Sequence, residues 1–85
     1  MSDIYTRVIV HFGVEKQLEQ LQEECGEVVT AVNHYRRGKR PLRHLLKEME
    51  DVRNLLNQME RVFPKNVILE IRAANEQHLE ELIKQ

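Results

Sequence analysis

The 85-residue sequence has few of the residues that usually stabilise a small protein. Its single cysteine, Cys25, can form no internal disulfide, which suits a reducing compartment. It has no tryptophan, and its net charge of −1 argues against a wholly basic nucleic-acid-binding protein. No apolar run approaches the length of a membrane span, and the first ten residues lack the pattern of a signal peptide. We therefore expect a soluble cytoplasmic protein with no membrane partner.

The length predicts one domain, residues 1–85, with little capacity to bury surface. A chain of this size hides only about 60–65% of the surface that it exposes when unfolded. Leu46, Leu55 and Val62 also widen one apolar stripe beyond what a single partner helix can cover. The sequence therefore predicts a homo-oligomer, a dimer or a tetramer, assembled as a helical bundle.

Apolar residues recur with helical spacing between the few glycines and prolines. Two series of apolar positions step alternately by three and four residues, and we call them the apolar seams. The seam residues are Val14, Leu18, Leu21, Cys25, Val28 and Val32 in the first series, and Leu42, Leu45, Met49, Val52, Leu56, Met59 and Phe63 in the second. On the first seam, Cys25 is expected to be a small core residue rather than a nucleophile.

The spacing predicts long helices over 14–36 and 42–63, joined by a turn at 37–41. A last helix is predicted over 66–84, with Asn66 as its N-cap after Pro64.

Residues 3–12 fit either a short helix or a strand. Asp3 could cap a helix that ends at Gly13, but the stretch "RVIVHF" is also rich in β-branched residues. Helix is favoured because nothing else in the chain could pair with a strand. The predicted fold class is all-α, a hairpin of two long antiparallel helices with flanking helices.

Two pairs of carboxylates hold the same position relative to the seams. Glu24 and Glu27 are three residues apart in "EECGEVV", and Glu48 and Asp51 are three apart in "EMEDVRN". Each carboxylate immediately precedes a seam residue, so antiparallel packing through the seams would set both pairs on one flank of the hairpin. That flank continues into Leu55, so we expect it to be partly covered. A covered group of four carboxylates needs a cation.

The ligand chemistry favours Mg²⁺, with Mn²⁺ as an alternative, because all the candidate donors are oxygen atoms. Residues three apart are separated by about 4.5 Å along a helix, which is close enough to share one ion. A single acidic pair is most often a solvated face, and the matched phase of the two pairs makes a metal site the better interpretation. Gly26, between two of the ligands, could allow close helix packing, could leave room for the metal, or could simply be tolerated there.

Two long stretches resemble the short, phage-type members of the MazG-like all-α nucleoside triphosphate pyrophosphohydrolases. They are "HFGVEKQLEQLQEECGEVVTAV" and "LLKEMEDVRNLLNQMERVF", over most of residues 10–64. Within them, "EECGE", twenty residues and "EMED" are similar to the family's EExxE…ExxD motif. The resemblance implies a MazG-like fold and Mg²⁺-dependent cleavage of a (d)NTP to the monophosphate and pyrophosphate. It also implies that Glu24, Glu27, Glu48 and Asp51 bind the metal, and that Glu23 or one of the ligands, such as Glu24, orients the attacking water.

The last helix departs from the family's pattern, in which an asparagine is often followed by lysine and arginine. This chain keeps Asn75, but Gln77, His78 and Glu80 follow it. We therefore expect the substrate contacts from a wider set of residues. The candidates are Asn75 and His78 in the last helix, Asn54 near Asp51, and Arg36, Arg37, Lys39 and Arg40 in the turn.

The basic turn, "YRRGKRPLRH", fits two interpretations equally well. Its cations could simply lie in solvent at a helix C-terminus, or they could contact a triphosphate. Nucleic acid is not the expected partner, because Tyr35 is the only aromatic residue nearby. For His11 and His44 we expect surface or packing roles. The alternative function is a non-catalytic helical module that oligomerises through its seams and binds a partner with this turn.

Overall fold

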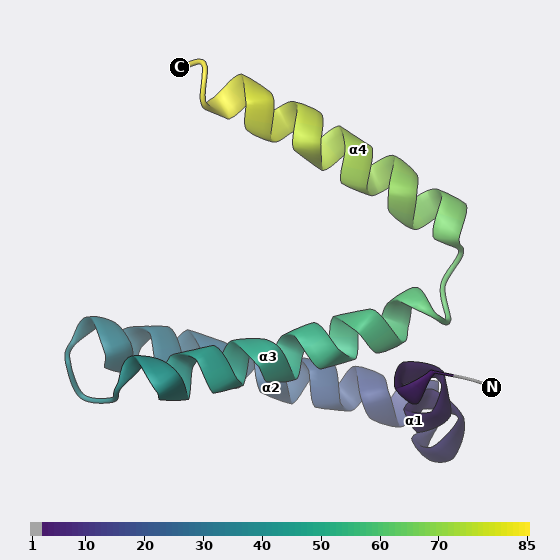
Figure 1. Ribbon diagram of the computed structural model, residues 1–85, viewed down its shortest axis with the longest axis horizontal. Coiled ribbons are helices and arrows are strands. Elements are labelled where there is room, and N and C mark those ends of the chain that lie inside the picture. The colour runs from purple at the N-terminus through teal and green to yellow at the C-terminus, as the bar shows by residue number, and fades with distance from the viewer. Residues whose placement is uncertain (1–2) are drawn as a thin grey trace.

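A computed structural model describes residues 3–85, and within that range the chain is all-helical, with no strand (Figure 1). Four helices follow one another in this range: α1 (Ile4–Phe12), α2 (Val14–Arg36), α3 (Leu42–Glu60) and α4 (Lys65–Leu82). The predicted all-α fold class is therefore confirmed. None of these helices is both long enough and apolar enough to cross a membrane.

Local chemistry explains where the first two helices begin. The backbone N–H of Thr6 donates to Oδ1 of Asp3 at 2.8 Å, so Asp3 caps α1 as predicted. Gly13 then separates α1 from α2 with a φ of 90°, in the left-handed region that favours glycine. Because this single residue makes the turn, the helix prediction for residues 3–12 and the predicted start of the long helix at position 14 are both confirmed.

The ends of the last two helices differ from the prediction. α3 ends at Glu60 rather than at position 63, and a turn that includes Val62 and Phe63 follows it. α4 begins at Lys65, with Pro64 at the cap position, so the prediction of Asn66 as the N-cap is wrong. Proline suits this place because it has no N–H to leave unpaired.

Helices α2 and α3 form the predicted antiparallel hairpin, with α1 across the end opposite the turn (Figure 1). Ile9 of α1 is buried there. Arg61, just after α3, donates from Nε to Oδ2 of Asp3 at 3.2 Å, and its guanidinium lies 4.7 Å from the ring centroid of Tyr5. These contacts close one end of the hairpin and leave its middle and the turn end open.

The contact between α2 and α3 runs beside the predicted seams rather than along them. On α2 the buried residues are Gln17 and Ala31, and on α3 they include Glu48 and Leu55. Residues 17 and 31 are fourteen apart, and residues 48 and 55 are seven apart. Residues at this spacing lie on one side of a helix, so each helix packs against the other along a single strip of its surface. The two strips include Glu24 and Glu48, two of the four carboxylates that were expected on a flank.

Four seam residues at the middle of the hairpin instead lie on an open surface, whereas Met59 is the one seam residue within residues 3–85 that is buried. Cys25, Val28, Met49 and Val52 line an apolar groove of about 300 Å³. Cys25 is exposed, so its prediction as a core residue is wrong. The physical reason is that the hairpin alone can bury only one strip of each helix, and the close packing of Ala31 favours the neighbouring strip.

Helix α4 leaves the hairpin after Pro64 and has no buried residue (Figure 1). Arg72 forms an ion pair with Glu60 near the junction of α3 and α4. The radius of gyration is 15.8 Å, whereas a compact domain of this length would have about 12 Å. The accessible surface is 6987 Å², whereas about 5,300 Å² is typical of a monomer of this mass. A single chain therefore leaves a large surplus of exposed surface.

Candidate functional site

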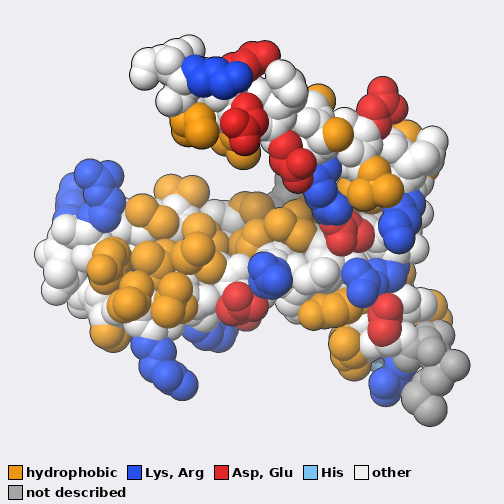
Figure 2. Space-filling view, turned by 45° about the horizontal axis from the view of Figure 1, so that its top comes forward, with side chains coloured by type: hydrophobic (Ala, Val, Ile, Leu, Met, Phe, Trp, Pro, Cys, Tyr) orange, Lys and Arg blue, Asp and Glu red, His pale blue; other side chains and the backbone are white. Residues whose placement is uncertain are grey.

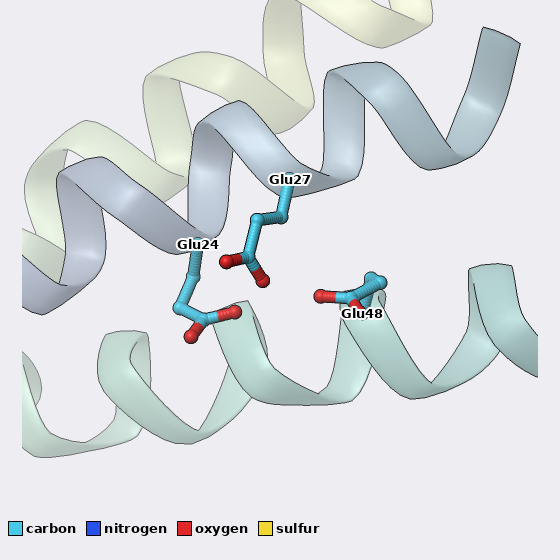
Figure 3. Close-up of side chains that lie close together, drawn as sticks. All are labelled: Glu24, Glu27 and Glu48. Carbon is cyan, nitrogen blue, oxygen red and sulfur yellow. The ribbon is translucent and has the colours of Figure 1, made fainter.

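Three of the four predicted carboxylate ligands converge between α2 and α3 (Figure 3). Glu24 and Glu27 come from α2 and Glu48 comes from α3, and one oxygen of each carboxylate lies within 4.8 Å of the others. Glu48 is only 8% exposed, Glu24 is half-buried and Glu27 is exposed. The group is therefore closed on the side of the helix contact and open on the other.

Two oxygens of this group have no hydrogen-bond donor within residues 3–85. They are Oε2 of Glu24 and Oε2 of Glu48, and both are buried. Burial of a carboxylate oxygen without a donor is unfavourable, and native structures contain few such atoms. A cation at this position would satisfy both oxygens, and a donor set made only of carboxylates suits Mg²⁺ or Mn²⁺.

The titration of Glu48 reflects the same crowding. The pKa of Glu48 is raised above its usual value, first by a hydrogen bond with Glu27 and then by burial. The negative charges of Glu27 and Asp51 raise this pKa further, while the Lys47 ammonium opposes the shift. In the metal-free protein these neighbours therefore favour the protonated form of Glu48 over the charged form.

The fourth predicted ligand, Asp51, lies outside the group of three. Its Oδ2 accepts a hydrogen bond from Nζ of Lys47, one turn earlier on α3, at 2.7 Å. The pKa of Lys47 is raised, first by this hydrogen bond and then by the charge of Asp51, with smaller contributions from Glu48 and Glu24. Lys47 thus competes with any cation for the carboxylate of Asp51.

An open groove of about 600 Å³ extends from the carboxylates towards the turn between α2 and α3. Glu23, Glu27 and Glu48 line one end of this groove. The other end is lined by three side chains that can carry positive charge, and Thr30 lies between the two ends on α2. The three are His34, Arg40 and His44.

Most of the residues that the sequence predicted to contact the substrate lie outside this groove. Of the basic turn residues, Arg40 lines it, whereas Arg36, Arg37 and Lys39 do not. Asn54 accepts a hydrogen bond at Oδ1 from Nε2 of Gln58, at 3.0 Å.

Asn75 and His78 are exposed on α4, which does not contribute to the groove within one chain. Conversely, His34 and His44 were not predicted as substrate residues. Their positions relative to the acidic residues could have suggested them, since His34 lies seven residues after Glu27 and His44 lies four before Glu48.

Comparison with known proteins found no matching family model, no match among curated proteins and no similar solved structure. The resemblance to the MazG-like family therefore stays a prediction based on the two motifs. The functional argument depends on the carboxylates and on the groove beside them.

Proposed function

We propose that this chain is a MazG-like pyrophosphohydrolase that hydrolyses a nucleoside or deoxynucleoside triphosphate to the monophosphate and pyrophosphate. The observation that supports this most strongly is Glu48, a buried carboxylate with an unpartnered oxygen that faces Glu24 and Glu27 across the hairpin. The adjoining groove of about 600 Å³ has the size of a small-molecule site, for which about 300–1,000 Å³ is usual. The similarity to the EExxE…ExxD motif supplies the reaction class.

Glu24, Glu27 and Glu48 are the residues that would hold Mg²⁺ or Mn²⁺ in this proposal. Asp51 is the fourth ligand once its carboxylate is released from Lys47. A bound divalent ion would neutralise phosphate charge and lower the pKa of a coordinated water.

The chain's own residues then have separate tasks. Glu23 is exposed at the acidic end of the groove, where its carboxylate can orient a water and accept its proton. Glu24 was the other candidate for this task, but its side chain is directed towards α3 (Figure 3). Glu23 is therefore the better placed of the two. Arg40 lines the same groove and can pair with phosphate oxygens.

We also propose that the protein acts as a homo-oligomer, a dimer or a tetramer. One chain exposes about 1,700 Å² more surface than a compact monomer of its mass. Two chains that buried this surplus would share an interface of about 3,400 Å², within the range of obligate homodimers. Apolar side chains gather over the hairpin and along the edge of α4 that faces it (Figure 2). In such an assembly, α4 of a second copy is the route by which Asn75 and His78 would reach a groove.

The second candidate is a non-catalytic helical interaction module. The apolar groove at Cys25, Val28, Met49 and Val52 and the scarcity of basic residues late in α4 favour it. It offers no reason, however, for three converging carboxylates of which two have a buried oxygen without a partner. The pyrophosphohydrolase is therefore the preferred proposal.

An assay of pyrophosphate release across a panel of NTPs and dNTPs tests this choice. With millimolar Mg²⁺ or Mn²⁺, we expect turnover of at least one nucleotide by the wild-type protein. Lys16→Gln is a matched control, because this residue lies on α2 outside the groove. An inactive wild type that still oligomerises would support the interaction module instead.

A further inference from the structure

The proposed reaction needs more positive charge around the phosphates than the predicted residues supply to the groove. The last helix lacks the basic residues of the family's pattern, and of the four predicted basic turn residues only Arg40 lines the groove. Two histidines share that end of the groove with Arg40. His34 comes from the last turn of α2, and His44 comes from the first turn of α3.

These three side chains have no carboxylate partner. No ion pair within residues 3–85 involves His34, Arg40 or His44. The one hydrogen bond among their side chains joins NH2 of Arg40 and Nδ1 of His44, at 3.5 Å. Both histidines are half-buried against the hairpin, and Arg40 is exposed beside them. Their donors are therefore free to bind an anion that enters the groove.

The spacing along the helices fits an extended anion that reaches both ends of the groove. Glu27 and His34 are seven residues apart on α2, which corresponds to about 10 Å along the helix axis. Glu48 and His44 are four residues apart on α3, or about 6 Å. A phosphate chain that starts at the carboxylates would therefore extend towards the histidines.

Gly26 lines the groove at its acidic end, between Glu23 and Glu27 on α2. A Cβ atom built at this position would meet nothing within 4 Å, so close helix packing does not require glycine here. The remaining interpretations of Gly26 are that it leaves room for the metal and that it is simply tolerated in the helix. The next residue towards the turn on this wall, Thr30, is also small, and its hydroxyl lies 3.4 Å from the carbonyl oxygen of Gly26.

We infer that His34, Arg40 and His44 form a phosphate-binding subsite at the turn end of the groove. The terminal phosphates of an oligophosphate bind there, while the cation-binding carboxylates face the phosphates nearer the nucleoside. The leaving pyrophosphate is then held at the turn, and the nucleoside extends away from it. The choice of a nucleoside triphosphate depends on the proposed function, whereas the subsite itself fits any Mg²⁺-bound oligophosphate.

Calorimetric titration with tripolyphosphate in the presence of Mg²⁺ tests the subsite without any need for turnover. We expect the double variant His34→Gln/His44→Gln and the single variant Arg40→Gln each to bind tripolyphosphate about tenfold more weakly than wild type, or worse. Arg43→Gln is the matched control, because this arginine is exposed on α3 and does not line the groove. Its affinity should equal that of wild type. Circular dichroism of each variant checks that the helices remain folded.

The outcomes separate this inference from the proposed reaction. Wild-type affinity in both the double variant and Arg40→Gln would overturn the subsite, even if nucleotides were hydrolysed. Failure of the wild-type protein to bind tripolyphosphate with Mg²⁺ would overturn it as well. Binding that depends on the three residues, in a protein that hydrolyses no nucleotide, would support the subsite and reject the pyrophosphohydrolase. Where there is turnover, the same variants should raise KM more than they lower kcat.

Discussion

Gln17 of α2 donates a hydrogen bond from Nε2 to Oε1 of Gln58 on α3, at 2.8 Å, inside the contact between the two long helices. Both residues are buried, and Gln58 is 1% exposed. Counting seven residues from this pair along each antiparallel helix leads to Glu24 and Asp51. A buried polar pair of this kind favours one register over its neighbours, because a shifted helix would leave both amides unpaired. The position of the carboxylate group therefore depends on a hydrogen bond two turns away.

Removal of one partner of this pair should destabilise the hairpin. Gln17→Leu leaves the amide oxygen of Gln58 buried without its donor, and we expect a loss of about 1–3 kcal/mol in the free energy of unfolding. Gln17→Leu/Gln58→Leu should recover most of that loss, because neither polar group remains. Urea unfolding measures both effects. A double variant that is much less stable than the single variant would show that the glutamine pair does not act as a unit.

The pH dependence of stability should identify Glu48. Because its pKa is raised in the folded protein, protonated Glu48 favours folding, and this contribution is lost as the pH rises through the folded-state pKa. In metal-free protein, Glu48→Gln should therefore raise the melting temperature at neutral pH and change it little at acid pH. Calorimetry of both proteins between about pH 4 and pH 8 measures the difference. An equal pH dependence in the two proteins would mean that Glu48 titrates normally.

Divalent metal should stabilise the wild-type protein. A ligand present at about a hundred times its Kd adds about 2.7 kcal/mol to the free energy of unfolding. Glu27→Gln should abolish the Mg²⁺-dependent rise in melting temperature and slightly raise the melting temperature of the metal-free protein, since like charges are removed. Glu15→Gln, on α2 outside the groove, is the matched control. If millimolar Mg²⁺ and Mn²⁺ leave wild-type melting unchanged, the three glutamates are not a metal site.

Lys47 should weaken metal binding by holding Asp51. Lys47→Met removes the ammonium that donates to Asp51, so the carboxylate becomes free to join the group, and calorimetry should show tighter Mg²⁺ binding. Asp51→Asn should weaken binding in the Lys47→Met background. Equal Mg²⁺ affinity in wild type and Lys47→Met would exclude the competition between lysine and metal.

Substitutions of Gly26 should separate stability from ligand access. Glycine in a helix interior is about 1 kcal/mol less favourable than alanine, and a Cβ here meets no atom, so Gly26→Ala should raise the free energy of unfolding by about that amount. Gly26→Leu should be similarly stable but project into the groove and raise KM for the nucleotide. A Gly26→Leu protein with wild-type KM would mean that the substrate does not pass over Gly26.

Local signals in the sequence were sufficient to predict the helices. Asp3 and Gly13 mark the limits of α1 through their own capping and turn chemistry. The phase of the hairpin contact was not predictable in the same way. Apolar spacing identifies the apolar face of a helix, but it does not say whether the hairpin partner or another chain covers that face. The burial of Gln17 depends on Gln58, 41 residues away, and nothing near Gln17 in the sequence indicates that partner.

The candidate site shows the same limit. The spacing of Glu24, Glu27 and Glu48 predicted that these residues would converge, and they do. Asp51 has the same spacing, but Lys47, four residues earlier, provides a nearer partner. The direction of α4 could not be derived, because it depends on the few contacts that this helix makes near Pro64 and not on its own pattern.

The central claim is that the carboxylate group supports cleavage between the α- and β-phosphates. Mass spectrometry of the products of the best nucleotide substrate, with Mg²⁺, measures this directly. We expect monophosphate and pyrophosphate in equal amounts from the wild-type protein, and a severe loss of kcat in Glu48→Gln, because this variant removes the buried ligand. Diphosphate with orthophosphate would contradict the assigned bond, and no turnover of any nucleotide with Mg²⁺ or Mn²⁺ would contradict the proposed function itself.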